Sequence, residues 1–407
     1  MIEFDSLIYL LLSLFILFVL FSRRVMTNTI WTATMTPLAS IIGSGFLIAA
    51  PLLNSLSGNR APFLMLILCA ASYGVGEVIR WNIVDVEPRL ESNDIENSKQ
   101  NKIRINERLG EWVLSFAYIL SITYYLYLFS SFFLRMTGEH SIYVEKGVVT
   151  LVIMSIAFFG HQHGLNSLEK LESVSVNIKL SIIITFLVGL ISYQFFNAEG
   201  MREATEVAND LSFNTVSVAL GLLIMVQGFE TSRYLFEKYD RQMRVKSMRY
   251  AQLISSLIYL ILIIFFVPVF HAHPLRGVIS ETSVIDIGKY VFTLAPTFLF
   301  AAAMASQLSA AVADMGGGGG LVSELSKGKI KSSNAYLIIA LIGVVLVWFF
   351  NIFEIISYAS KAFALYYFFQ CVSSCLIQYR LNRKKFLFSV LMSLLCLVIV
   401  IFGRAYE

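Results

Sequence analysis

Charged residues are scarce in this sequence of 407 residues. Asp, Glu, Lys and Arg together make up 14% of the chain, whereas an ordinary soluble domain has about 25%. Hydrophobic residues make up 57%, and one soluble core cannot bury so much apolar surface because such cores stop growing near ~250–300 residues. The composition therefore excludes an ordinary soluble domain and predicts an all-α polytopic protein in a lipid bilayer.

The sequence also lacks the motifs that signal an enzyme or a bound cofactor. It has no HExxH motif, and no catalytic triad or pair of aspartates stands out at membrane depth. Five glycines at 316–320 are not followed by a GK[ST] motif, so we expect a flexible hinge rather than a phosphate loop. The cysteines lie in apolar runs without metal-type spacing to a histidine. We therefore expect no enzyme activity, cofactor or metal, and the net charge of +4 requires no nucleic-acid partner.

Long apolar runs predict about twelve transmembrane helices, since ~20 residues cross the hydrocarbon core. The runs are residues 7–22, 31–53, 61–83, 109–133, 143–160, 171–195, 215–236, 251–270, 286–322, 334–350, 353–379 and 386–402. We interpret residues 1–28 as an extra N-terminal transmembrane helix, 29–380 as a core of ten helices, and 381–407 as a C-terminal transmembrane helix.

Basic residues favour alternate loops, which sets the expected orientation. With Arg23 and Arg24 inside, the other basic clusters also fall inside, and both termini lie outside. The first apolar run is followed rather than preceded by positive charge, so it is expected to be an uncleaved helix and not a signal peptide. We expect a multi-pass protein of the plasma (inner) membrane.

Glycine interrupts two of the apolar runs at membrane depth. The two segments are Ile42-Gly43-Ser44-Gly45 and Gln227-Gly228-Phe229-Glu230. Either the glycines allow helices to pack closely, or the helices unwind there and their free N–H and C=O groups bind a polar ligand. Helices one to five and six to ten can form two units that each begin with an interrupted helix. Because five is odd, the second unit is inverted, which predicts a five-plus-five inverted repeat.

Two ionisable residues lie within the apolar runs. Glu230 either forms a solvated pair with Arg233 near the inner interface or is a buried functional carboxylate. Lys179 either extends to the interface or is buried, where it would replace a bound cation or carry a proton. Both residues are therefore candidates for coupling transport to an ion.

Hydroxyl-bearing side chains accompany these charges. Ser306 and Ser309 are three residues apart and share one helix face. They either bond their own backbone or contribute to a site. Tyr118 and Tyr125 of the third long helix either pack in the core or line the substrate pocket.

The interrupted segments resemble the amino acid–polyamine–organocation (APC) superfamily of transporters, which have the LeuT-type inverted-repeat fold. Residues 41–46, IIGSGF, are similar to the family's unwound IGSGIF segment, and residues 228–230 are similar to its GFE motif. Lys179 resembles the family position where a lysine occupies the space of sodium, and the resemblance implies that Ser306 and Ser309 lie near it. The family's KNP motif is absent, because residues 238–240 are KYD.

The breaks and the resemblance together predict a secondary transporter (permease) that works by alternating access. Its small-molecule substrate would be an amino acid or a related zwitterion or amine. We expect the backbone of residues 42–45 to receive the carboxylate, the carbonyls of residues 227–229 to receive the amine, and Phe229 to act as an aromatic gate. Transport would be proton-coupled or sodium-independent through Lys179. The alternative, suggested by the missing family residues, is a transport-inactive membrane receptor or sensor with the same fold.

Overall fold

The computed structural model describes residues 2–43, 45–92, 97–138, 141–164, 169–196, 212–236, 238–274 and 282–406. Within these ranges the regular secondary structure is helical and contains no strand. The α-helices are α1 (Ile2–Leu20), α2 (Arg23–Met26), α3 (Thr29–Ile41), α4 (Gly45–Ser57), α5 (Ala61–Trp81), α6 (Glu87–Ser92), α7 (Asn97–Thr137), α8 (Ile142–His163), α9 (Glu169–Phe196), α10 (Phe213–Leu220), α11 (Arg241–Ala272), α12 (Ser283–Gly288), α13 (Ala295–Leu325), α14 (Ser332–Phe349), α15 (Ile352–Leu381) and α16 (Arg383–Phe402). Short helical turns of other types are η1 (Gly58–Arg60), η2 (Asn82–Val86), η4 (Leu223–Val226) and η5 (Phe229–Tyr234).

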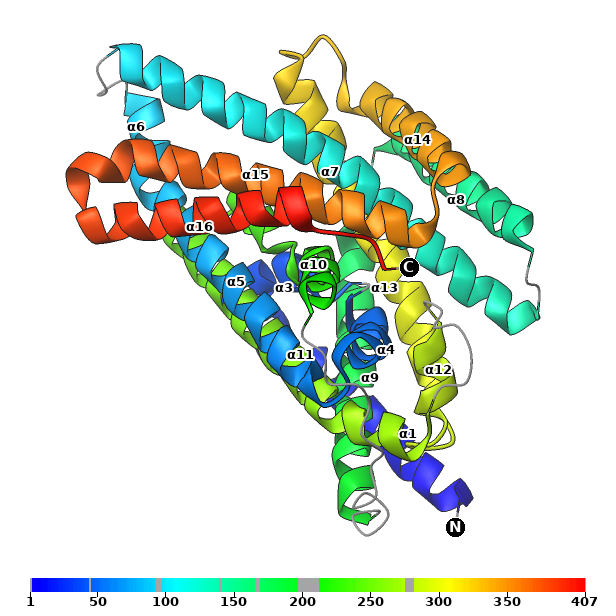
Figure 1. Ribbon diagram of the computed structural model, residues 1–407. Coiled ribbons are helices and arrows are strands. Elements are labelled where there is room, and N and C mark those ends of the chain that lie inside the picture. Colours follow the sequence, from blue (N-terminus) through cyan, green and yellow to red (C-terminus); the bar gives the residue numbers. More distant parts are fainter. Residues whose placement is uncertain are drawn as a thin grey trace.

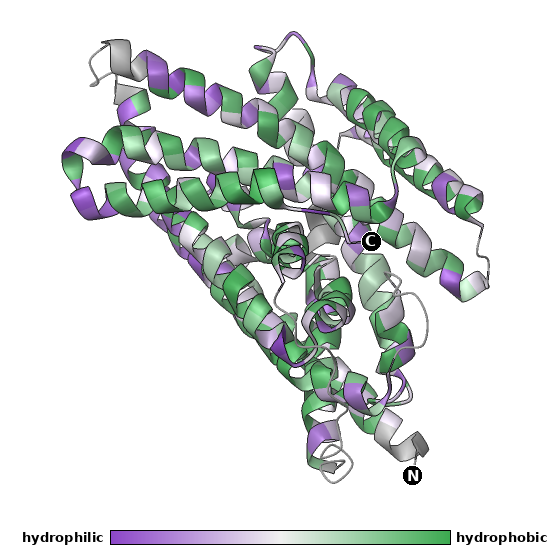
Figure 2. Cartoon of the chain, in the orientation of Figure 1, coloured by the Kyte–Doolittle hydropathy of each residue, from purple (hydrophilic) through white to green (hydrophobic). Residues whose placement is uncertain are grey.

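The all-α polytopic architecture expected from the composition is confirmed. Among the described residues, eight helical stretches are long and apolar enough to cross a membrane. Of the runs expected to span, α1, the interrupted pair α10–η5 and α15 are not among these eight, and the pair α3–α4 is included only through α4, in the stretch Gly45–Leu90. Figure 2 shows hydrophobic residues along the outer helices, such as α16, and hydrophilic residues where α15 joins α16. This distribution suits a lipid-facing surface with polar helix ends.

The helices pack as antiparallel neighbours around a continuous apolar core. α7 lies between α13 and α15, and α15 runs beside α16 (Figure 1). The pair α8 and α14 also packs against α7, and α14 packs against α13. The N-terminal α1 lies along α9, where Ser13 Oγ and Ser181 Oγ are 2.9 Å apart. The extra N-terminal helix therefore covers the helix that carries Lys179.

The glycine run at 316–320, where the sequence suggested a flexible hinge, is regular helix in this structure. α13 continues through it as far as Leu325. Tyr336 of α14 packs so closely on Gly319 that a Cβ atom there would overlap its ring, and Tyr118 of α7 lies against Gly317 and Gly318. Helix is retained because bilayer-embedded backbone must satisfy its own hydrogen bonds, and the missing side chains let neighbouring helices approach.

The polar segment that follows α5 is helical where the structure describes it. η2 and α6 continue the helical path after α5, and α7 already begins at Asn97. The long run 286–322 divides into α12 and α13. In both places polar residues lie at helix ends, and apolar periodicity alone does not predict where those helices end.

The segment that follows α16 packs against α10, the first part of the second interrupted helix. The Arg404 N–H donates to the Ser217 carbonyl over 3.0 Å, and this carbonyl in the last turn of α10 also accepts the Gly221 N–H over 3.1 Å. Gly221 lies directly against the Arg404 backbone, where a Cβ atom would overlap the carbonyl oxygen. Phe402 and Phe213 pack edge to face with ring centroids 5.8 Å apart. The C-terminal segment is thus a strap across α10.

Candidate functional site

The two glycine breaks lie against each other in the core. α3 ends at Ile41 and α4 begins at Gly45. A Cβ atom on Gly45 would lie 2.6 Å from the Met225 carbonyl oxygen, and one on Gly228 would lie 2.8 Å from the Ser40 carbonyl carbon. Gly228 has a φ of 112°, a conformation that favours glycine. Close packing and helix interruption therefore occur together at these residues.

The break after α3 leaves backbone carbonyls without helical partners, and side chains from three other segments supply donors. Lys179 Nζ donates to the Ala39 carbonyl over 2.7 Å, and Tyr259 Oη donates to the Ile41 carbonyl over 2.8 Å. Ser306 Oγ lies 3.3 Å from the Ile42 carbonyl and 3.2 Å from the Gly43 carbonyl. Donors on α9, α11 and α13 therefore form hydrogen bonds to the carbonyls at the C-terminal end of α3 and in the break that follows it. Ser44 lies outside the described residues.

Lys179 is completely buried, with 0% of its surface exposed. The interpretation that its side chain extends to the membrane interface is therefore wrong. Its ammonium lies at the C-terminal end of α3, where the helix dipole favours a cation. Together with Gly43, Ser306 and apolar neighbours it lines a small cavity with room for about one water molecule.

Ser309 stands apart from this arrangement. Its hydroxyl donates to the Ser306 carbonyl of the same helix over 3.1 Å. This is the local backbone bond that Ser residues commonly make in membrane helices. Ser306 thus contacts the break directly, whereas Ser309 acts on its own helix.

Glu230 is fully buried beside the second break. Its carboxylate accepts hydrogen bonds from the Gly228 N–H at 3.0 Å and from Tyr367 Oη at 2.7 Å. Phe229 stacks on Tyr367 with ring centroids 5.2 Å apart. The alternative of a solvated pair with Arg233 is wrong, because Glu230 has no exposure and Arg233 pairs with other carboxylates.

Of the two candidate tyrosines, Tyr125 lies at the breaks. Its ring is next to Gly43, where a Cβ atom would come within 3.2 Å, and its hydroxyl lies 3.5 Å from Gln227 Nε2. Tyr118 packs instead on the glycine run and edge to face against Phe363, with centroids 6.2 Å apart. The structure therefore brings Tyr125 to both interrupted helices and places Tyr118 in the neighbouring layer.

Two acceptor atoms of the second break have no hydrogen-bond partner among the described residues. They are Gln227 Oε1 and Glu230 Oε1, and both are buried. An unsatisfied buried acceptor is costly, at about 1–3 kcal/mol, so it calls for an explanation such as an absent ligand or proton. The described residues contain no group of three or more side chains suited to bind a metal ion.

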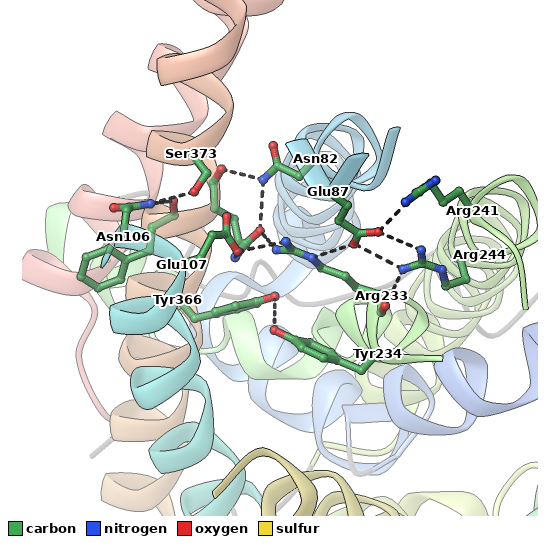
Figure 3. A network of polar contacts seen from close by, with 12 residues as sticks. Asn82, Glu87, Asn106, Glu107, Arg233, Tyr234, Arg241, Arg244, Tyr366 and Ser373 are labelled. Carbon is green, nitrogen blue, oxygen red and sulfur yellow. Dashed lines mark hydrogen bonds and ion pairs between the residues drawn. The ribbon is translucent and has the colours of Figure 1, made fainter. Parts of the chain in front are cut away.

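An ionic network adjoins Glu230 along η5. Arg233 donates to Glu87 at 3.2 Å and to Glu107 at 2.9 Å, and Arg244 binds the same Glu87 at 2.8 Å. Figure 3 shows the Arg233 guanidinium between the two carboxylates. Gln370 extends the network by donating to Glu107 at 3.2 Å. The network links α6, α7, η5, α11 and α15 on the side of the basic loops.

Several residues of this region were not among the sequence-based candidates. They are Ser72, Glu87, Glu107, Tyr259, Asp314 and Tyr367. Asp314 could have been found as a carboxylate inside a long apolar run. The two tyrosines carry no signal that separates them from the other 17 of the 19 in the chain.

Comparison with known proteins identifies the family of the chain. A family model described as an APC superfamily transporter matches residues 23–403. An uncharacterised protein of Aquifex aeolicus (strain VF5) is 38% identical over 403 residues, which cover 98% of this chain and 97% of that relative. The resemblance found in the interrupted helices is confirmed, and the chain belongs to the APC superfamily of transporters.

Proposed function

We propose that the protein is a secondary transporter of amino acids or related small zwitterions and amines, which it moves across the plasma (inner) membrane by alternating access. The observation that carries this proposal is the contact between the two breaks, Gly45 against Met225 and Gly228 against Ser40. Interrupted helices that meet in the core present free backbone groups to a polar ligand at membrane depth. They also belong to two halves that can move against each other.

The polarity of the breaks supports a zwitterionic substrate. The N-terminal end of α4 at Gly45 offers backbone N–H groups and a positive dipole end to a carboxylate. The buried acceptors Gln227 Oε1 and Glu230 Oε1 suit an ammonium group. Phe229, which stacks on Tyr367, would lie over the ammonium end of the substrate as an aromatic gate.

The position of Lys179 supports transport without sodium. Its ammonium already occupies the negative end of α3, where a bound cation would otherwise lie. Glu230 is the candidate for carrying a proton, because a buried carboxylate at membrane depth is costly to keep ionised. Proton-coupled or sodium-independent uptake follows from these two roles.

The ionic network would act as the inner gate. Arg233 joins carboxylates on α6 and α7, so these elements cannot separate while the network is intact. Opening towards the basic loops then requires the Arg233 pairs to break. In alternating access, this network would break when the protein opens towards the basic loops, and contacts on the opposite side of the membrane would form to close that side.

The test is ligand binding followed by flux. Purified protein is screened by thermal unfolding against amino acids, amines and nucleobases, with Lys179→Ala alongside. A ligand at ~100 times its Kd should stabilise the protein by about 2.7 kcal/mol. The ligand that stabilises the protein is then added outside proteoliposomes that contain the protein, with and without sodium, and its uptake is measured. Uptake without sodium supports the proposal, uptake that requires sodium contradicts the role of Lys179, and binding without flux indicates a receptor.

A further inference from the structure

Gln307 is a buried carboxamide that the proposed function does not use. It lies in α13 directly after Ser306, and 0% of its surface is exposed. Neither its Nε2 donor nor its Oε1 acceptor has a hydrogen-bond partner among the described residues. A buried polar group that stays unpaired destabilises the fold, so a side chain with both of its groups unpaired calls for an explanation.

The depth of Gln307 in the membrane is that of the first break. The hydroxyl of the preceding residue, Ser306, lies 3.2 Å from the Gly43 carbonyl oxygen. Tyr125 of α7 reaches the same glycine, since a Cβ atom on Gly43 would lie 3.2 Å from its ring. Successive residues of an α-helix are only about 1.5 Å apart along the axis. Ser306, Gln307 and Tyr125 therefore lie at one level of the core.

The helical period turns Gln307 towards α7. Residues seven and eleven positions apart share one face of a helix. Seven positions after Gln307, Asp314 accepts a hydrogen bond from Ser121 of α7. Eleven positions after it, Gly318 packs against Tyr118 of α7. The face of α13 that carries Gln307 is therefore the face that packs on α7.

The surroundings of Gln307 combine small side chains with a second unpaired carboxamide. Its neighbours one turn away on the same face of α13 are Ala303, Ala310 and Ala311. Alanine has no side-chain donor or acceptor. On α7, Tyr125 Oη lies 3.5 Å from Gln227 Nε2, and Gln227 Oε1 has no partner among the described residues. Two buried glutamines with unused hydrogen-bonding groups thus border the region of Tyr125 and the breaks.

We propose that Gln307 is a substrate-binding residue that selects amino acids whose neutral side chain both donates and accepts hydrogen bonds, namely a carboxamide or a hydroxyl. The inference rests on the proposed transport of amino acids and names the class within it. The substrate carboxylate and ammonium use the N-terminal end of α4 and the acceptors of the second break, which leaves Gln307 for the side chain.

The two groups of the amide set this preference. Nε2 donates to the substrate side chain and Oε1 accepts from it, so a polar neutral side chain satisfies both. An apolar side chain of the same shape leaves both groups unpaired. A site that is built to form hydrogen bonds with a substrate strongly rejects the analogue that lacks the polar group.

The test compares amino acids that have nearly the same shape. Asparagine is compared with leucine, and threonine with valine, by thermal unfolding of the purified full-length protein over a range of ligand concentrations. The wild type should bind the polar member of each pair at least about tenfold more tightly. Gln307→Met keeps the bulk of the side chain but lacks the amide, so this ratio should fall to about one. A ratio that is unchanged in Gln307→Met overturns the proposal.

Gln378→Met is the matched control. Gln378 is also a buried glutamine in a long helix, but its Nε2 donates to Asp85 over 2.6 Å. Asp85 keeps its ion pair with Lys385 in this variant. The preference for the polar amino acids should remain as in the wild type. A loss of the same size in Gln378→Met overturns the specific role of Gln307.

The stability of the unliganded protein gives a readout that needs no substrate. Replacing an unpaired buried amide with an apolar side chain of similar volume removes a cost, so Gln307→Met should unfold at a higher denaturant concentration than the wild type. A lower midpoint, or a failure to fold, shows that the fold itself requires the amide and overturns the proposal.

The wild-type comparison separates this inference from the proposed function. If the wild type binds none of the twenty standard amino acids, the proposed transport of amino acids fails, and the role of Gln307 fails with it. If it binds leucine and valine as tightly as asparagine and threonine, amino-acid binding stands and only the role of Gln307 is overturned.

Discussion

The ammonium of Lys179 donates a 2.7 Å hydrogen bond to the Ala39 carbonyl, at the open end of α3. This contact predicts a stability effect that is independent of transport. Lys179→Met keeps the bulk but leaves the carbonyl and the negative helix end without their donor. The free energy of unfolding should fall by about 1–3 kcal/mol, measured from denaturant midpoints in detergent. Lys361→Met, at a partly exposed position on α15, is the control and should change little. Equal losses in both variants would contradict a special role for Lys179.

The glycines of the two breaks predict a steep contrast among Gly→Ala substitutions. Gly45→Ala would force a Cβ atom against the Met225 backbone, and Gly228→Ala would place a side chain at a φ of 112°. Each should cost roughly 2 kcal/mol or more, or prevent folding. Gly320→Ala meets open space in a helix and should stabilise by up to about 1 kcal/mol. Thermal unfolding of the three variants measures the contrast, and a neutral Gly45→Ala would argue against the close contact of the breaks.

Arg233 predicts a large effect because it is buried between two carboxylates. Arg233→Gln would leave Glu107 without its cation, while Glu87 keeps Arg244, and breaking a buried pair costs about 3–5 kcal/mol. Arg249→Gln is the matched control, since its side chain is 47% exposed and lies 3.6 Å from Glu77. An exposed pair contributes about 0–1 kcal/mol. Unfolding midpoints in detergent compare the two, and similar small losses would show that the network is not a closed buried cluster.

The location of the breaks could be predicted from sequence because glycine interrupts otherwise apolar runs at corresponding places in two halves of the chain. Residues 42–43 and 227–228 accordingly lie at the observed interruptions. Lys179 could be recognised as a candidate from the sequence for a similar reason, since a charge within an apolar run is conspicuous. These signals are local in sequence.

The ionic network could not be predicted in this way. Glu87 and Glu107 lie in a stretch whose polarity resembles a loop, and their common partner Arg233 is more than a hundred residues away. Tyr259 and Tyr367 reach the breaks only through the packing of α11 and α15. Such pairings depend on which helices become neighbours, and apolar periodicity does not determine that choice.

The strap across α10 predicts a coupling that a double-variant experiment can isolate. Gly221→Ala in the full chain would drive a Cβ atom into the Arg404 carbonyl, so it should destabilise strongly. In a chain that lacks residues 404–407 the obstacle is gone, and the same substitution should be nearly neutral, because Gly221 has an ordinary helical φ of −67°. The two changes are therefore expected to be non-additive by at least about 1 kcal/mol. Ala219→Gly is a control that should have the same effect in both chains. If Gly221→Ala costs equally with and without the segment, the segment does not rest on α10. Non-additivity would instead establish that residues after α16 restrain α10, the first part of the second interrupted helix.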